Sequence, residues 1–203
     1  MRPTKRSAAQ NSALLYPMVG VVAAVLLLGA SGFFWITTTP NGPSIGGPFT
    51  LENSMGKTVT AKDFRGKYML VYFGYTYCPD VCPTTLNVVA AALDELGPRA
   101  KNLVPIFITV DPQRDTPQVM RRYTAAFSPD LIGLTGTSDE IAKVAKEYRV
   151  YYAKHVTGSG PNDYSMDHSS IIYLMAPDGK FIAPIGAEQS SADMAAHIRK
   201  LMS

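Results

Sequence analysis

Residues 68–83 read YMLVYFGYTYCPDVCP, an apolar run followed by a short loop that carries both cysteines of the chain. The run from Tyr68 to Phe73 is rich in aromatic and β-branched residues, which is typical of a strand buried on both faces of a sheet. Apolar residues then recur at helical spacing from Thr84 to Leu96, and Gly97-Pro98 end this helix. The order is strand, cysteine loop, helix, so we expect a site beyond the carboxyl end of a central strand.

A second strand and two helices are expected downstream. Residues 103–110, LVPIFITV, repeat the buried-strand pattern. Residues 116–127 begin with Thr-Pro, which is typical of the cap and first turn of a helix. Residues 138–148 begin with Ser-Asp-Glu, and these early acidic residues suit the start of another helix. A short strand is expected over residues 151–154.

Two hairpins and a last helix complete the expected domain. Residues 49–51 and 58–60 are short strand-like pieces that predict an opening hairpin. Residues 170–175 and 181–185 flank a Pro-Asp-Gly turn, which predicts a second hairpin, and a final helix is expected over residues 191–201. The sum predicts an α/β protein of thioredoxin-like fold: an N-terminal β-hairpin, a βαβ unit, an inserted helix, and a closing ββα unit.

An uncharged apolar block precedes this domain, from residue 17 to residue 36. As a helix rising about 1.5 Å per residue, it spans roughly 30 Å, the thickness of a bilayer core. Tyr16 and the aromatic run 33–35 stand at its two ends, where membrane interfaces attract aromatic rings. A cleavable secretory signal is the alternative, but its apolar part is shorter, about 7–15 residues. We therefore expect a transmembrane anchor over residues 16–36.

Charges around this block predict its orientation. Arg2, Lys5 and Arg6 precede it, so the positive-inside rule assigns residues 1–15 to the cytoplasmic side and the rest of the chain to the other side. The segment before the anchor has about 15 residues, which is too short to contain a mitochondrial transit peptide in addition to the anchor. The expected location is therefore a bacterial inner membrane with a periplasmic domain, in preference to a mitochondrial inner membrane facing the intermembrane space.

The remaining chain divides into a linker and a neutral domain. Residues 37–48, rich in Gly, Pro, Ser and Thr, predict a flexible linker, and residues 49–203 form the globular domain. Three of the 19 Lys and Arg precede the anchor, so the other 16 balance the 16 Asp and Glu. No basic stripe remains, which argues against nucleic acid as a partner.

The two cysteines favour a metal site. Cys78 and Cys82 are spaced C-x-x-x-C, one residue longer than the C-x-x-C of redox thioredoxins. Residues four apart share one face of a helical turn, so both sulfurs can converge on one ion, and the dipole at a helix N-terminus favours their thiolate forms. Thiolates suit Cu(I), and imidazole suits copper in either oxidation state. Two Cys and one His would therefore hold one copper.

His168 is the best placed of the three histidines to complete this site. It precedes the strand expected at residues 170–175, and in thioredoxins the loop entering that strand faces the cysteines and carries a cis-proline, which is absent here. Asp167 or a backbone carbonyl is a candidate partner for its second ring nitrogen. A plain loop-end histidine is the alternative. His155, before a Gly-rich loop, and His197, within the final helix, are weaker candidates.

Further acidic residues are candidates near the metal ligands. Asp80 lies between the cysteines, where a tuning charge and a plain turn residue are equally expected. Asp111, at the end of the second strand, is either a neighbour of the site or the start of a turn with Pro112. For Arg114 and Asp115 we favour a local pair with a structural role.

Three separated motifs together resemble the Sco/SenC family of cytochrome c oxidase assembly factors. They are YCPDVCP at 77–83, VDPQRDTP at 110–117 and DYSMDHSS at 163–170, and the similarity covers about residues 47–201. The resemblance implies copper ligands at Cys78, Cys82 and His168. It further implies delivery of copper to the CuA centre of oxidase subunit II, or reduction of that subunit's cysteines before metal loading.

The expected function is therefore that of a copper metallochaperone, a binding and transfer protein with no catalytic residues of its own. Its expected partners are oxidase subunit II, other copper chaperones or thioredoxin-like reductants, and a membrane. The alternative is a thiol-disulfide oxidoreductase that uses Cys78 and Cys82 as a redox pair. C-x-x-x-C spacing and the missing proline weigh against it. A peroxiredoxin-like peroxidase is disfavoured because its Thr and Arg environment is not identifiable.

Overall fold

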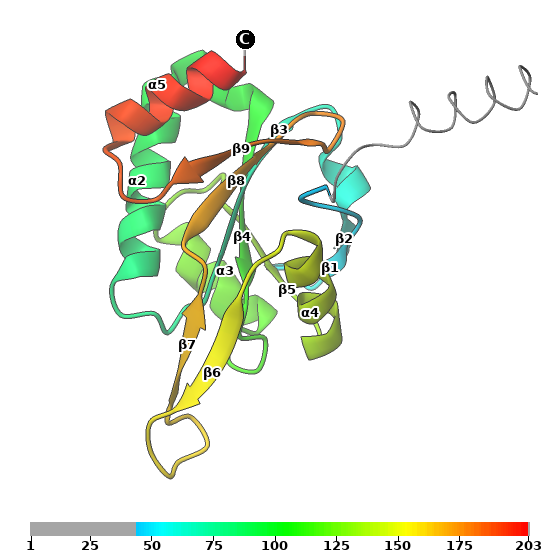
Figure 1. The fold of residues 1–203 in the computed structure, drawn as a ribbon, viewed down its shortest axis with the longest axis vertical. Coiled ribbons are helices and arrows are strands. Elements are labelled where there is room, and N and C mark those ends of the chain that lie inside the picture. Colours follow the sequence, from blue (N-terminus) through cyan, green and yellow to red (C-terminus); the bar gives the residue numbers. More distant parts are fainter. Residues whose placement is uncertain (1–43, 203) are drawn as a thin grey trace, which may run out of the picture. The chain divides into compact units, whose positions relative to one another are not determined.

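A seven-stranded sheet forms the centre of residues 44–202, the part of the chain that the computed structural model describes. Its strand order is β2-β1-β5-β4-β3-β8-β9 (Figure 1). The strands are β1 (Thr50–Asn53), β2 (Thr58–Thr60), β3 (Tyr68–Gly74), β4 (Leu103–Thr109), β5 (Ile132–Thr135), β8 (Ile171–Met175) and β9 (Phe181–Gly186).

Strands β3 and β4 form the buried middle of this sheet. They run parallel, in a register that pairs Gly74 with Thr109, and β8 lies antiparallel on the other side of β3. Every residue of β3 after Tyr68 is buried, as its uninterrupted apolar run predicted. The N–H of Val110 donates to the carbonyl of Gly74 at 2.8 Å, so the chain leaves both strands at one edge of the sheet. The cysteine loop begins at that edge.

Within residues 44–202, four α-helices accompany the sheet: α2 (Val81–Leu96), α3 (Pro117–Ala125), α4 (Ser138–Glu147) and α5 (Ser191–Leu201), with 3-10 turns at Ala61–Phe64 and Gly97–Asn102. Figure 1 shows α2 and α5 together on the left of the strands and α4 on the right. Arg199 of α5 donates to the carbonyl of Glu95 in α2 at 3.1 Å. The cap of α3 is Thr116, as expected, and α4 is capped by Thr137 through a capping box with Glu140.

A separate two-stranded hairpin carries the candidate histidine. Its strands are β6 (Tyr152–Val156) and β7 (Tyr164–His168), and in the described residues they pair only with each other. In Figure 1 this hairpin extends away from α5, at the lower end of the view. The sequence predicted only the first of these strands and treated residues 163–169 as a loop. That prediction was wrong for β7, because its residues, YSMDH, alternate weakly and include two polar side chains at the end.

Strand β5 was also absent from the predicted order of elements. It joins β1 to β4 in the sheet, antiparallel to the first and parallel to the second. Gly133 sits in its middle, where an added Cβ would lie 3.0 Å from Thr124 and 3.3 Å from Met120 of α3. Helix α3 therefore packs closely on β5. The strand is only four residues long and contains a glycine, so its sequence lacks the apolar pattern by which strands are predicted.

The remaining elements follow the prediction. The opening hairpin, the closing hairpin and the final helix are confirmed, and the whole is the expected thioredoxin-like α/β arrangement. Helix α2 begins three residues earlier than expected, so Cys82 lies within it. Of the linker predicted at residues 37–48, only the last five are described, and the N–H of Gly46 donates to the carbonyl of Glu147 at 2.8 Å.

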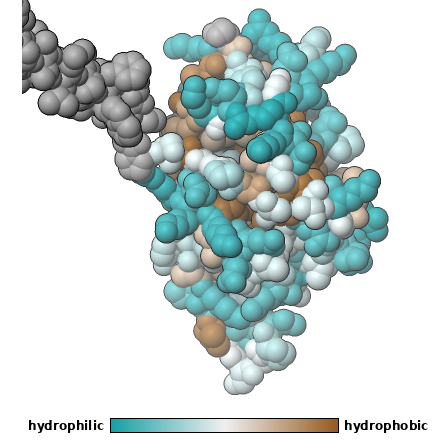
Figure 2. Space-filling view, turned by 90° about the vertical axis from the view of Figure 1, so that its right-hand side faces the viewer, coloured by the Kyte–Doolittle hydropathy of each residue, from teal (hydrophilic) through white to brown (hydrophobic). Residues whose placement is uncertain are grey.

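The transmembrane anchor predicted at residues 16–36 and the preceding segment 1–15 lie outside the described residues. Between residues 44 and 202, no helix has the length and apolar character needed to span a bilayer. On the side drawn in Figure 2, hydrophilic residues cover most of the surface. The large apolar side chains exposed in the described part of the chain are Met55, Tyr77, Val81, Tyr151, Val156 and Ile171. Tyr77 and Val81 directly precede the two cysteines.

Candidate metal centre

The two cysteines meet at the start of α2. Cys78 lies in the loop after β3, where its N–H donates to the carbonyl of Tyr75 at 3.3 Å. Cys82 is the second residue of α2 and is fully buried. The N–H of Cys82 donates to Sγ of Cys78 at 3.4 Å, which draws the first sulfur toward the helix terminus. The four-residue spacing thus directs both sulfurs to one place, as the sequence predicted.

His168 reaches the cysteines from the end of β7. Its Nε2 lies 3.3 Å from Sγ of Cys82, and its Nδ1 lies 3.2 Å from the carbonyl oxygen of Ser169. A carbonyl accepts only, so Nδ1 donates in this contact, and Nε2 is the ring nitrogen that faces the sulfurs. Of the two partners expected for the second ring nitrogen, the structure therefore has the backbone carbonyl and not Asp167.

The ring of His168 is held between two tyrosines that the sequence analysis did not single out. Its centroid lies 6.1 Å from that of Tyr72 and 6.0 Å from that of Tyr75, both in edge-on geometry. Tyr72 also donates its hydroxyl to Sγ of Cys82 at 3.9 Å. Tyr72 belongs to β3 and Tyr75 directly follows it. Because the two are three positions apart, the alternation of the strand alone would not place both beside His168.

The donor atoms of Cys78, Cys82 and His168 all lie within 4.8 Å of one another. Bonds of about 2.0 Å to imidazole and about 2.3 Å to thiolate, the values for zinc, place the donors of one ion roughly 3.5–4 Å apart. The three side chains therefore fit one metal ion after small adjustments. Thiolate donors suit Cu(I), and imidazole suits copper in either oxidation state.

The two thiols differ strongly in acidity. The hydrogen bond from Cys82 is the largest of the effects that lower the pKa of Cys78 to about 5, and the backbone N–H groups of Cys82 and Asp80 add to it. The same hydrogen bond, together with burial, raises the pKa of Cys82 well above its ordinary value. The expectation that the helix terminus favours both thiolates therefore holds for Cys78 alone in the metal-free protein.

The three candidate acidic neighbours have partners away from the Cys-Cys-His group. Asp80 is exposed, and its carboxylate accepts from the hydroxyl of Thr84 at 3.3 Å. Asp167 is also exposed and pairs with His155 at 2.8 Å. Asp111 is buried and accepts from the hydroxyl of Tyr164 at 2.8 Å. None of these carboxylates belongs to the Cys-Cys-His group.

Arg114 and Asp115 do not form the pair that the sequence predicted. Arg114 instead pairs with Asp111, three residues earlier. Asp115 accepts from the hydroxyls of Thr109 and Thr76, each at 2.6 Å, and from the N–H of Thr76 at 3.0 Å. Burial raises the pKa of Asp115, and these hydrogen bonds oppose that effect. Adjacent side chains diverge because each finds a partner on a different side of the turn.

The family model described as SCO1/SenC matches residues 37–203 of the chain. The chain belongs to the SCO1/SenC family. The human relative "Protein SCO1 homolog, mitochondrial" is 43% identical over 162 residues, which is 77% of this chain and 52% of that protein. The chain spans about half the length of the curated relatives that it matches.

Solved structures of SCO1/SenC proteins share this fold. ScoI of Bradyrhizobium japonicum, described with copper bound, is 46% identical with a TM-score of 0.72, over 78% of this chain and 99% of that one. ScoI of Arabidopsis thaliana, also described with copper bound, is 43% identical with a TM-score of 0.73, over 78% of this chain and 98% of that one. The thioredoxin-like fold is thus shown, and copper-bound proteins are among its neighbours.

Proposed function

We propose that this SCO1/SenC protein binds one copper ion through Cys78, Cys82 and His168 and delivers it to the CuA centre of cytochrome c oxidase subunit II. One observation carries the proposal: three donors of the type that copper prefers lie within 4.8 Å at the edge of the sheet. The copper-bound state described for two similar proteins supports the choice of metal.

The donor set suits a cargo that changes oxidation state. Two thiolates satisfy Cu(I), whereas Cu(II) gains more from the imidazole of His168. Nε2 already faces the sulfurs, because the contact of Nδ1 with the carbonyl of Ser169 orients the ring. Cys78 is partly exposed, which lets a partner's thiolate reach the metal for transfer by ligand exchange.

Copper analysis of wild type and His168→Ala tests this proposal. The reduced full chain should bind one equivalent of Cu(I) or Cu(II), and H168A should lose about tenfold or more in Cu(II) affinity but much less in Cu(I) affinity. His197→Ala is the matched control, because His197 is exposed on α5, and it should retain wild-type affinities. Unchanged Cu(II) affinity in H168A would remove His168 from the site.

A second function, reduction of the cysteines of subunit II, is supported by the unequal thiols. Cys78 is accessible with a pKa of about 5, while Cys82 is buried behind it. The Cys78 thiolate would attack a partner disulfide and displace one partner thiolate. Cys82 would then lose its proton and attack Cys78, which releases the second partner thiolate and leaves a Cys78–Cys82 disulfide.

Mixing experiments with the CuA domain of subunit II separate these two functions. For metal transfer, copper-loaded protein should give up its metal to the reduced, copper-free domain with no change in thiol content on either side. For thiol reduction, copper-free protein should reduce an oxidised domain, with one Cys78–Cys82 disulfide formed for each disulfide lost. Absence of both changes would exclude subunit II as a partner.

Attachment to a membrane belongs to the same proposal. We infer residues 1–15 on the cytoplasmic or matrix side, an anchor over 16–36, a linker over 37–48 and a copper-binding domain over 49–203. The uncharged block and the three basic residues before it support this arrangement. The sequence favoured a bacterial membrane, whereas the human relative is named a mitochondrial protein, which fits the alternative location.

A further inference from the structure

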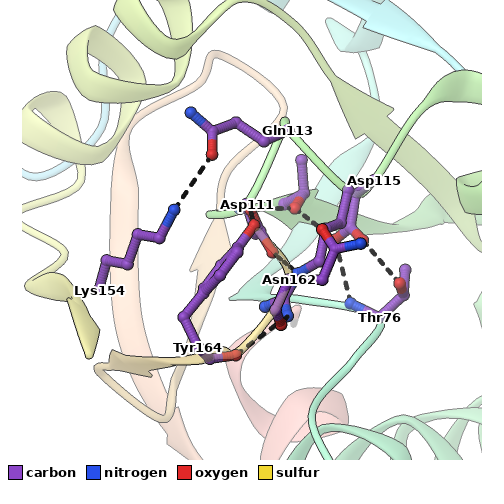
Figure 3. A network of polar contacts seen from close by, with 9 residues as sticks. Thr76, Asp111, Gln113, Asp115, Lys154, Asn162 and Tyr164 are labelled. Carbon is purple, nitrogen blue, oxygen red and sulfur yellow. Dashed lines mark hydrogen bonds and ion pairs between the residues drawn. The ribbon is translucent and has the colours of Figure 1, made fainter. Parts of the chain in front are cut away.

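A turn between β4 and α3 contacts both of the segments that supply metal ligands. The turn comprises residues 111–115, in which the N–H groups of Arg114 and Asp115 both donate to the carbonyl of Asp111, at 3.2 and 3.0 Å. These bonds fix the two side chains on a rigid piece of backbone. Asp115 is directed to Thr76 of the cysteine loop (Figure 3), and Arg114 is directed mainly to Tyr164 of the hairpin.

Arg114 lies between aromatic rings from the two segments. Its guanidinium carbon is 3.6 Å from the ring centroid of Tyr164, the first residue of β7, and 4.8 Å from that of Tyr77, which precedes Cys78. The Arg114 side chain is only 8% exposed and Tyr164 is buried, so the contact between these two is largely desolvated and stronger than a surface one. One side chain therefore connects β7 to the cysteine loop.

Hydrogen bonds add direction to this contact. Nη1 of Arg114 donates to the backbone carbonyl of Tyr164 at 3.0 Å, and its Nε donates to Asp111. The other oxygen of the Asp111 carboxylate accepts from the hydroxyl of Tyr164. Arg114 thus binds the backbone of Tyr164, at the start of β7, and Asp111 binds its side chain. Figure 3 shows the contact between Asp111 and Tyr164.

Asp115 anchors the opposite segment. It is fully buried, and its carboxylate accepts two hydrogen bonds from Thr76, two residues before Cys78. The turn is therefore bonded to the cysteine loop by Asp115 and to the hairpin by Arg114. Strands β6 and β7 have no ladder to the main sheet within residues 44–202, so side-chain contacts of this kind place the hairpin relative to the cysteines.

We propose that Arg114 is a positioning residue for copper binding: it holds β7 so that His168, at the other end of that strand, meets the sulfurs of Cys78 and Cys82. The inference rests on the proposed copper site. Arg114 itself touches no metal ligand. Its loss should therefore act through His168, and Cu(II), which depends on the imidazole, should lose more affinity than Cu(I), which two thiolates satisfy.

Arg114→Met and Lys154→Met form a matched pair for the test. Lys154 places its ammonium 3.6 Å from the same Tyr164 ring and donates to Oε1 of Gln113 at 3.3 Å. Lys154 is exposed, however, and its contacts reach only the hairpin and the turn, not the cysteine loop. In the full-length protein, R114M should lower Cu(II) affinity by about tenfold or more, the range for residues that orient metal ligands, and leave Cu(I) affinity nearly unchanged. K154M should change neither.

Two further measurements separate positioning from general damage. Combining R114M with H168A should weaken Cu(II) binding no further than H168A alone, because Arg114 acts through that histidine. In the metal-free protein, R114M should speed amide hydrogen exchange in β7 while exchange in β3 stays slow. Should R114M fold poorly, Tyr77→Leu removes the exposed ring on the cysteine side and should weaken Cu(II) binding in the same direction.

Equal losses of Cu(I) and Cu(II) affinity in R114M, or additive losses with H168A, would overturn the inference. Wild-type Cu(II) affinity in R114M and Y77L would overturn it as well, while leaving the copper site itself intact. A wild-type protein that binds no copper would instead overturn the proposed function, and the inference with it.

Discussion

Cys78 and Cys82 have the same chemistry in the sequence and opposite roles in the structure. Cys78 lies before the helix and accepts from the N–H of Cys82, whereas Cys82 lies inside the helix and is fully buried. A sulfur that accepts hydrogen bonds is stabilised as a thiolate, and a buried sulfur is stabilised as a thiol. In the reduced, metal-free protein the proton therefore stays on Cys82, and Cys78 carries the negative charge.

This difference predicts the pH dependence of alkylation. The thiolate is the reactive form, and the pKa of Cys78 is lowered to about 5, so Cys78 of the reduced, metal-free protein should react with iodoacetamide at a constant rate above that pH. The rate should fall as Cys78 protonates below it. In Cys82→Ala the midpoint should rise toward the ordinary value of about 8.5, because the largest stabilising hydrogen bond is lost. A wild-type midpoint near the ordinary value would contradict this account.

At the level of residues, the sequence singled out three candidate ligands that the structure brings together, but it did not predict their surroundings. Cys78, Cys82 and His168 were singled out because sulfur and imidazole are rare and their positions flank central strands. Asp80 and Asp167 were candidates through nearness in sequence, yet both point to exposed partners. Besides Asp111, three residues earlier, Arg114 contacts Tyr164, 50 positions later in the chain, and no spacing rule identifies such a contact.

Among the elements, strand β3 determines how closely the first turn of α2, with Cys82, packs against the sheet. Its last residue, Gly74, lies directly against the first turn of α2: an added Cβ would sit 2.7 Å from Sγ of Cys82 and 2.8 Å from Cε2 of Phe107. Real Cβ atoms do not approach so closely, so any larger side chain must displace the sulfur or the ring. A glycine is needed here for space and not for backbone conformation.

Gly74→Ala should therefore disturb both stability and metal binding. Overpacking of this kind costs about 1–3 kcal/mol of unfolding free energy, and the displaced sulfur should also weaken copper binding. Gly186→Ala is the control, because it likewise ends a strand but its nearest new contact would be Gln189 at 3.8 Å. Denaturant unfolding and copper titration of both variants test this. Equal stability and copper affinity in G74A and G186A would contradict this account, because the end of β3 would then accommodate a Cβ without loss of stability or copper binding.

The two strands missed by the sequence analysis have different physical causes. Strand β5 is short and contains Gly133, which is selected by the close approach of α3 and not by strand propensity. Strand β7 is half polar because its hairpin lies outside the main sheet and has little core to bury. The long apolar strands and well-capped helices were predicted correctly, since their signals are local. The separate hairpin depends on tertiary contacts.

For the whole molecule, copper should act as a stabilising ligand. A ligand that binds only the folded state adds about 2.7 kcal/mol at a hundredfold excess over Kd, which for a domain of this size raises Tm by roughly 5–10 °C. Thermal unfolding of the reduced protein with and without Cu(I) measures this shift. Cys82→Ser, which keeps the size of the side chain but loses the soft donor, should show almost none. An equal shift in C82S would mean that copper binds elsewhere.

The burial of one sulfur fixes the order of events when copper moves between proteins. Cys78 and His168 each have part of their surface exposed, whereas Cys82 has none. Under the proposed function, an incoming donor replaces Cys78 or His168 first, and Cys82 releases the metal last. Loading follows the reverse route. The ion thus stays attached to at least one protein at every step, and the recipient controls its release because the innermost bond breaks only after new bonds have formed.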